Sequence, residues 1–121
     1  MCKEYAKNAK KSTKKNKLLI VEDDPGLLKQ LKWCFSDFDL SIAKDRQSAV
    51  AELQKSEPPV VTLDLGLPPD PTNAQEGLDT LAEMLSIRPK TKIIVVTGND
   101  EKENALKAIE LGAYDFYQKP V

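Results

Sequence analysis

The sequence predicts an α/β fold: a doubly wound, parallel, five-stranded sheet between two layers of helices. From Leu18 onward, short apolar runs alternate with longer amphipathic stretches, which is the pattern of successive βα units. The chain has 121 residues, of which 40% are hydrophobic and 31% are charged. This size and composition suit one domain with a buried core and leave little room for a second.

The first half of the folded region is predicted to contain two βα units. Residues 18–21 form an apolar strand, and Pro25 then opens a helix that Asp24 is placed to cap. Residues 40–43 form a second strand, and Asp45 caps a helix that ends before residues 58–59, both proline. Apolar residues at helical spacing predict the inward faces of the two helices: Leu27, Leu28, Leu31 and Phe35, then Ala49, Val50 and Leu53.

The second half is predicted to continue the same alternation. A strand at 60–63 leads into Asp64 and a proline-rich loop from Gly66 to about Glu76, before a helix that turns Leu78, Leu81 and Leu85 inward. A strand at 93–96 follows, and then a helix with a capping box and a terminal glycine. The last strand spans 114–117. In the helix between the strands at 93–96 and 114–117, the predicted capping box is Asp100 and Glu103. Its predicted inward face is Ala105, Leu106 and Ile109, and Gly112 stands at its end.

The near-neutral net charge of −1 hides an uneven distribution. Residues 1–17 carry seven lysines against one glutamate, a balance of +6, so the rest of the chain carries −7. A lysine-rich stretch without apolar periodicity indicates a basic flexible tail, although contact with nucleic acid or an acidic surface is the alternative. The chain has neither an apolar run of about 20 residues nor the apolar stretch of a secretory signal, so we expect a cytoplasmic location.

The residue types exclude several kinds of catalytic site. The chain has no histidine, and its two cysteines lack the spacing of a zinc site. Histidine-based triads and metalloprotease sites are therefore ruled out. Any metal must be bound through oxygen ligands.

Polar side chains follow four of the five predicted strands at their carboxyl ends. Glu22 and Asp23 follow the first strand, Asp64 the third, Thr97 the fourth and Lys119 the fifth. Right-handed crossovers keep the strands parallel, so these groups meet at the sheet edge where ligands bind in open α/β folds. Three close carboxylates repel one another unless a hard cation such as Mg²⁺ joins them. The edge is therefore predicted to bind Mg²⁺ and an anion.

Each of these residues also has a purely structural explanation. Glu22 and Asp23 could favour a helix N-terminus, Thr97 could be a turn residue, and Lys119 could be an ordinary surface lysine. Asp64 is harder to explain in this way, because a carboxylate that directly follows a buried strand is costly without a partner. The coincidence at four strand ends favours a functional site.

The motifs at these strand ends resemble the receiver domain of bacterial two-component response regulators. The similar segments are LLIVEDD at 18–24, VTLDLGLP at 61–68, IVVTG at 94–98 and GAYDFYQKP at 112–120. The resemblance covers residues 18–121. It implies a flavodoxin-like sheet with strand order 2-1-3-4-5 and a cytoplasmic phosphoprotein of a phosphorelay.

The resemblance also implies a role for each candidate residue. Asp64 would be the phosphoacceptor, with Thr97 and Lys119 holding the phosphoryl oxygens. Phe116 would turn with the Thr97 hydroxyl and reshape an output surface around the fourth helix and fifth strand. The Mg²⁺ ligands would be Asp23, Asp64 and the Gly66 carbonyl, with Glu22 assisting through water.

Partners follow from the same resemblance. The phosphoryl donor would be a histidine kinase or a phosphotransfer protein, and a homodimer is possible. The chain would not be an enzyme, beyond assisting its own phosphorylation and dephosphorylation. The output is expected to regulate transcription through a domain absent from this chain, so we expect no direct nucleic-acid binding by residues 18–121.

The sequence departs from the family pattern in three places. Glu22 replaces the more common aspartate, which lengthens the reach to the metal by one methylene group. The loop after Pro68 is longer than in most receivers and resembles a subgroup in which the receiver precedes a sigma-54-type ATPase, as in NtrC-like activators. The chain stops at Val121, before the fifth helix of a receiver, so we expect exposed apolar surface near the first and fifth strands.

Two other functions remain open. The fold could serve only for protein contacts, without phosphorylation, but degenerate receivers usually lack some of the residues present here. A small phosphohydrolase with an aspartyl-phosphate intermediate usually has a second acid two residues after the nucleophile. In this chain that position is Gly66.

Overall fold

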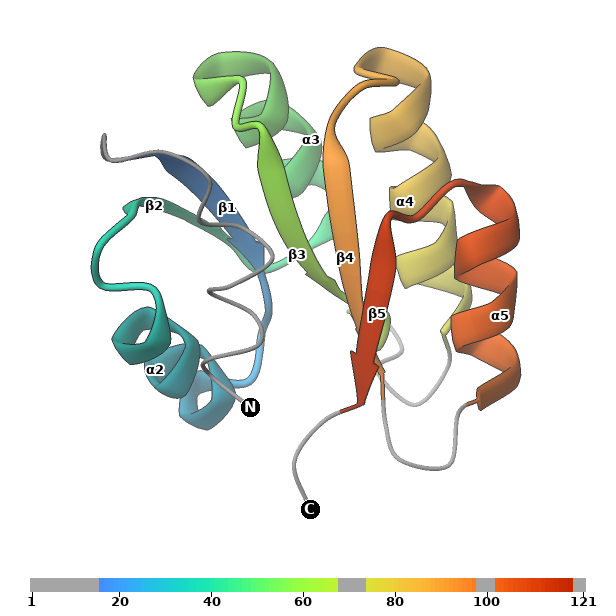
Figure 1. The fold of residues 1–121 in the computed structure, drawn as a ribbon, viewed down its shortest axis with the longest axis horizontal. Coiled ribbons are helices and arrows are strands. Elements are labelled where there is room, and N and C mark those ends of the chain that lie inside the picture. Colours follow the sequence, from blue (N-terminus) through green and yellow to red (C-terminus); the bar gives the residue numbers. More distant parts are fainter. Residues whose placement is uncertain (1–15, 68–73, 98–101, 119–121) are drawn as a thin grey trace.

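The structure, a computed structural model, describes residues 16–67, 74–97 and 102–118. Five strands in these ranges form one parallel sheet with the order β2-β1-β3-β4-β5 (Figure 1). The predicted flavodoxin-like, doubly wound fold is confirmed. The strands are β1 (Lys17–Val21), β2 (Asp39–Ala43), β3 (Val60–Asp64), β4 (Lys92–Thr97) and β5 (Asp115–Gln118).

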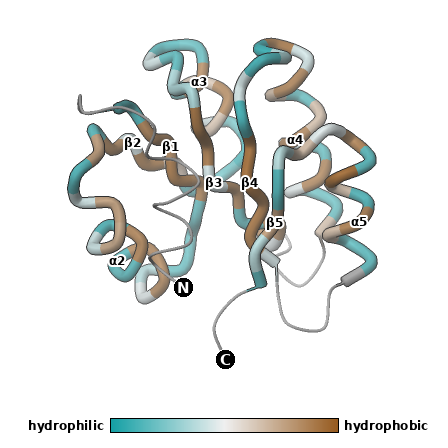
Figure 2. The backbone as a smooth tube through the Cα atoms, viewed as in Figure 1, coloured by the Kyte–Doolittle hydropathy of each residue, from teal (hydrophilic) through white to brown (hydrophobic). Residues whose placement is uncertain are grey.

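The described ranges contain four helices, which cover both faces of the sheet. These are α2 (Pro25–Cys34), α3 (Arg46–Ser56), α4 (Gln75–Ile87) and α5 (Lys102–Leu111). Helix α2 lies on one face, and α3, α4 and α5 lie on the other (Figure 1). Figure 2 shows the hydrophobic residues concentrated in β1, β3 and β4, as expected for strands buried on both faces. None of the four helices is long and apolar enough to cross a membrane.

Two of the predicted helix caps are confirmed. The Gly26 N–H donates to Asp24 Oδ1 at 3.0 Å, and the Ser48 N–H donates to Asp45 Oδ1 at 2.8 Å. The Ser48 hydroxyl in turn accepts from the Asp45 N–H at 3.3 Å, completing a capping box. The hydrogen bonds from Ser48 hold the pKa of Asp45 below its usual value. The cap predicted at Asp100 lies outside the described residues.

The inward face of α5 differs from the prediction. Leu106 and Ile109 were expected to point inward, but they are 56% and 40% exposed. Ala105 is buried as predicted, and the other buried residue is Ala108, one helical turn further along. Helix α5 packs at the edge of the sheet, on β4 and β5, where small side chains let its backbone come close. The helix is therefore rotated so that the two alanines face the sheet and the larger Leu106 and Ile109 face outward.

The apolar surface expected to be exposed at the first strand is buried. Leu18 and Ile20 of β1 are fully buried in a cluster with Leu28 and Leu31 of α2. That part of the prediction is wrong, because α2 covers this side of the sheet. The residues of β5 are intermediate in exposure, and Tyr117 packs against the same cluster.

Candidate functional site

The structure brings three acidic side chains together at the carboxyl edge of the sheet. Glu22 and Asp23 follow β1, and Asp64 is the last residue of β3, which pairs with β1 in parallel. One carboxylate oxygen from each residue lies within 4.8 Å of the other two. Glu22 and Asp64 are buried, and Asp23 is half-buried. The parallel register of two adjacent strands therefore concentrates negative charge at one point.

Backbone amides hold two of these carboxylates in place. The Gly66 N–H donates to Asp64 Oδ1 at 3.0 Å, and the Asp24 N–H donates to Glu22 Oε2 at 3.2 Å. The Glu22 backbone is itself fixed by donation from its N–H to the Ala43 carbonyl at 2.9 Å. The side chains are thus aimed at one another before any ligand arrives, which is the preorganisation that an ion site requires.

The donor set fits a hard divalent cation. Close carboxylates repel, and a cation with oxygen ligands relieves that repulsion. Two of the three groups are largely removed from water, so solvent screens their charges less than it would at the surface. The Gly66 N–H lies beside Asp64, and the metal ligation predicted for the Gly66 carbonyl stays a prediction.

Thr97 places a hydroxyl group at the same edge of the sheet. It ends β4, and Asp64 pairs in register with Val96, the residue before it. Thr97 is only 1% exposed, and its Oγ1 has no hydrogen-bond partner. Such a buried polar atom costs about 1–3 kcal/mol unless a ligand or water satisfies it. An anion bound at Asp64 would supply the missing acceptor.

Phe116 and Lys119 were the other residues predicted on β5 or just after it. Phe116 pairs with Val95 and packs against the cluster between the sheet and α3–α5. Side chains alternate along β4, so Thr97 faces the same side of the sheet as Val95. The hydroxyl and the aromatic ring therefore belong to one face on neighbouring strands. Lys119 lies outside the described residues.

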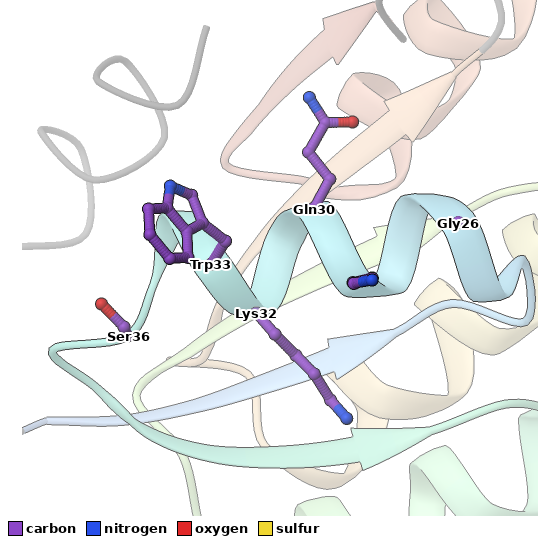
Figure 3. A pocket seen from close by; sticks show the side chains of 6 residues that line it. Gly26, Gln30, Lys32, Trp33 and Ser36 are labelled. Atoms are coloured by element: carbon purple, nitrogen blue, oxygen red, sulfur yellow. The ribbon is translucent and has the colours of Figure 1, made fainter.

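A shallow groove of about 610 Å³ runs along the outer side of α2. Figure 3 shows Gln30 and Lys32 leaving the helix on opposite sides, with Trp33 near its end. Trp33 is 82% exposed, as its position opposite the apolar stripe predicts. None of the three clustered carboxylates lines the groove, so the acidic cluster is the better candidate site.

Sequence reasoning missed two features beside the site. Arg46 of α3 reaches α4, where its Nε lies 2.7 Å from Glu83 Oε1, and this hydrogen bond raises the pKa of Arg46. Glu76 and Asp79 lie 3.6 Å and 3.9 Å from the same guanidinium group. The helical spacing of the three acids is a visible signal, although it does not identify their partner. The second feature is Gly77, where a glycine early in a helix signals a close backbone approach.

The fold and the acidic edge together define a class of protein: a doubly wound α/β domain with a cation-type carboxylate cluster at the ends of its strands. The family model described as "Response regulator receiver domain" matches residues 18–121 of the chain. The chain therefore belongs to the receiver domain family of two-component signalling, and its acidic cluster is of the type at which receivers bind Mg²⁺.

Individual relatives agree with this assignment. The chain is 33% identical over 106 residues to the alginate biosynthesis transcriptional regulatory protein AlgB of Pseudomonas putida, covering 86% of this chain and 22% of AlgB. It is 30% identical to the chemotaxis protein CheY of Listeria monocytogenes, covering 86% of both. The crystal structure of the NtrX receiver domain from Brucella abortus has a TM-score of 0.75 and 29% identity, covering 86% of both chains. The chain thus spans about a fifth of AlgB but most of CheY.

Proposed function

We propose that this chain is a phosphoacceptor receiver that takes a phosphoryl group onto Asp64 and uses it to change a binding surface. One observation carries the proposal: the carboxylates of Glu22, Asp23 and Asp64 converge within 4.8 Å at the end of the sheet where the Thr97 hydroxyl is buried without a partner. The carboxylates suit a cation, and the hydroxyl suits an anion. A phosphoryl group bound together with Mg²⁺ satisfies both.

The transfer step uses Asp64 as the nucleophile. A carboxylate oxygen of Asp64 forms a bond to phosphorus while the bond between phosphorus and the histidine nitrogen of the donor breaks. The electron pair of that broken bond stays on the imidazole. The hydrogen bond from the Gly66 N–H to Oδ1 orients the carboxylate. We also propose that Lys119 pairs with the phosphoryl oxygens.

The proposed Mg²⁺ ligands are Asp23, Asp64 and the Gly66 carbonyl, with Glu22 assisting through water. When bound, the ion offsets the negative charge that accumulates on the phosphoryl oxygens during transfer. Asp23 is the least buried of the three acids and can admit the hydrated ion. The two buried carboxylates hold the deeper side of the site.

The phosphoryl group is proposed to act on the partner surface through Thr97. Its hydroxyl gains an acceptor when the phosphoryl group is present, and its movement leaves room for Phe116 to turn inward. The affected surface would be α5 and β5, and the side chains of Leu106 on α5 and of Tyr114, just before β5, are about half exposed. The output of the reaction is then an altered contact surface, and the chain is not an enzyme beyond assisting its own phosphorylation and dephosphorylation.

The proposed partners are a histidine kinase or phosphotransfer protein as donor, and a second copy of the chain as dimer partner. The likeness to AlgB, whose name describes a transcriptional regulatory protein, supports an output that regulates transcription. The long loop after Pro68 supports the proposal that the chain belongs to the sigma-54 activator subgroup. We propose residues 18–121 as the receiver and residues 1–17 as a basic tail. Strand β1 begins one residue earlier, at Lys17.

The proposal is tested by phosphorylation with a small donor. We expect acetyl phosphate with Mg²⁺ to add one hydroxylamine-labile phosphoryl group to the chain, detected by intact mass. Asp64→Asn should add none, whereas Asp39→Asn, at an exposed acid on β2, should react like the wild type. Equal labelling of Asp64→Asn would assign the reaction elsewhere and refute the proposal.

The same measurement separates the alternatives. A receiver fold used only for protein contacts would bind its partner without labelling in any variant. A phosphohydrolase would turn over a small phosphate ester at enzyme-like rates. Gly66 occupies the position where such enzymes usually carry a second acid, so we expect no such turnover.

A further inference from the structure

The first turn of α4 touches the peptide that follows the acidic strand end. Gly77 is the third residue of α4 and is buried. A Cβ atom on it would overlap the Cα and carbonyl oxygen of Leu65 and would lie 2.6 Å from the Leu65 carbonyl carbon. All three are backbone atoms, so no rotation of a side chain can make room. A residue without a side chain is required for α4 to lie this close to Leu65.

The same peptide unit also holds Asp64. The N–H of Gly66 donates to Asp64 Oδ1 at 3.0 Å, and the carbonyl group of this peptide is that of Leu65. The Leu65 N–H is anchored separately, by donation to the Val96 carbonyl at 3.3 Å. Because a peptide unit is planar, a push on its carbonyl group also turns its N–H. The contact with α4 and the bond to the carboxylate are thus two ends of one rigid plane.

We infer that Gly77 is a positioning residue for Asp64: it lets α4 seat the Leu65–Gly66 peptide so that its N–H orients the Asp64 carboxylate. The inference rests on the proposed function for the role of Asp64, and on the contacts above for the link itself. It connects α4 with the phosphoacceptor through backbone atoms. Residues that touch neither the metal nor the phosphoryl group can then influence the site.

A methyl group at position 77 is expected to disturb the site in a defined way. Either α4 moves outward or the Leu65–Gly66 peptide tilts, and the Gly66 N–H loses its alignment with Oδ1 in both cases. Hydrogen bonds to charged groups are among the stronger ones in proteins, so we expect Mg²⁺ affinity to fall about tenfold. The rate of phosphorylation by acetyl phosphate should fall by at least as much.

The test uses the whole 121-residue chain labelled with ¹⁵N, with Mg²⁺ as the only added ligand. We expect Gly77→Ala to move the Gly66 amide signal before Mg²⁺ is added and to weaken Mg²⁺ binding about tenfold. The matched control is Met84→Val, which shortens a fully buried side chain about two turns further along α4. This control should lower the melting temperature but keep the wild-type Gly66 signal and Mg²⁺ affinity. A wild-type signal and affinity in Gly77→Ala, or equal losses in both variants, overturns the inference.

Two further measurements keep the result interpretable. If wild-type chain is not labelled by acetyl phosphate while Mg²⁺ binding still separates the two variants, the proposed function fails and the positioning role stands. If Gly77→Ala does not fold, Asp64→Ala replaces it, since it removes the acceptor at the other end of the peptide. We then expect the Gly77 amide signal to move together with that of Gly66, and a stationary Gly77 signal overturns the inference.

Discussion

Removing the Asp64 charge should make the metal-free chain more stable and make it insensitive to Mg²⁺. The perturbation is Asp64→Asn, which keeps the size of the side chain and an oxygen able to accept from the Gly66 N–H. It removes one of three negative charges gathered at the sheet edge. Folding is what brings these charges together, so their repulsion lowers the stability of the folded state.

The magnitude follows from the spacing of the carboxylates. Two unit charges separated by 4.8 Å, the upper limit in this cluster, repel by about 3.5 kcal/mol at an effective dielectric constant of ~20. Neutralising Asp64 removes two of the three repulsions. Asp23 is half-buried, and water screens its share, so we expect a net gain of about 1–3 kcal/mol in the free energy of unfolding.

Mg²⁺ should narrow or reverse the difference in the free energy of unfolding between Asp64→Asn and the wild type. A ligand at one hundred times its dissociation constant stabilises the folded state by about 2.7 kcal/mol, and Asp64→Asn should gain much less. Urea denaturation with EDTA and with Mg²⁺ measures both effects, with Asp39→Asn as an exposed control expected to stay within ~0.5 kcal/mol of wild type. Two results would refute the reasoning: lower stability of Asp64→Asn in EDTA, or an equal gain from Mg²⁺ in both proteins.

Three further changes test the fold around the site. Asp45→Ala removes an N-cap and should cost about 1 kcal/mol in urea denaturation near neutral pH. Because the pKa of Asp45 is lowered in the folded chain, this cost should be complete above the usual pKa of an aspartate and should shrink in acid as the carboxylate is protonated. Thr62→Val replaces a buried hydroxyl that has no hydrogen-bond partner, so thermal unfolding should show a gain of about 1 kcal/mol, and a loss would reveal an unseen partner. Gly112→Ala places a side chain at φ +116° and 3.0 Å from Leu85 Cδ1, so the chain should lose about 1–3 kcal/mol. Gly26→Ala on α2, whose new Cβ would make only an ordinary contact with Asp24 Oδ1 at 3.6 Å, should not destabilise it.

The sequence was sufficient to place the strands and the acids at their ends. Four-residue apolar runs flanked by caps and glycines mark buried parallel strands, and the residue after each run must emerge at the same edge. Asp64 and Glu22 could therefore be brought together without coordinates. Their roles in phosphorylation and metal binding remain predictions, because these roles depend on ligands and not on the fold alone.

Features set by contacts between elements were beyond local sequence patterns. Helix α5 carries two possible inward faces, one with Leu106 and Ile109 and one with Ala105 and Ala108. Packing on β4 and β5 buries the second face and leaves the first exposed. Arg46 finds its three acids only after the rotations of α3 and α4 are fixed. Gly77 could be noticed in the sequence, but its contact with Leu65 could not.

The three helices on one face of the sheet are held by different kinds of contact, so we expect them to differ in how easily they move. Arg46 of α3 forms ion pairs with Glu76 and Glu83 of α4, and these pairs hold the two helices together. Helix α5 packs on β4, β5 and α4, and it buries Ala105 and Ala108, whose methyl groups offer few ridges to interlock with the neighbouring elements. We therefore expect the contact through these alanines to resist sliding less than the ion pairs between α3 and α4. We expect a displacement that begins at Thr97, which precedes α5 in the chain, to move α5 as a rigid body. The ion pairs of Arg46 should keep α3 and α4 in place.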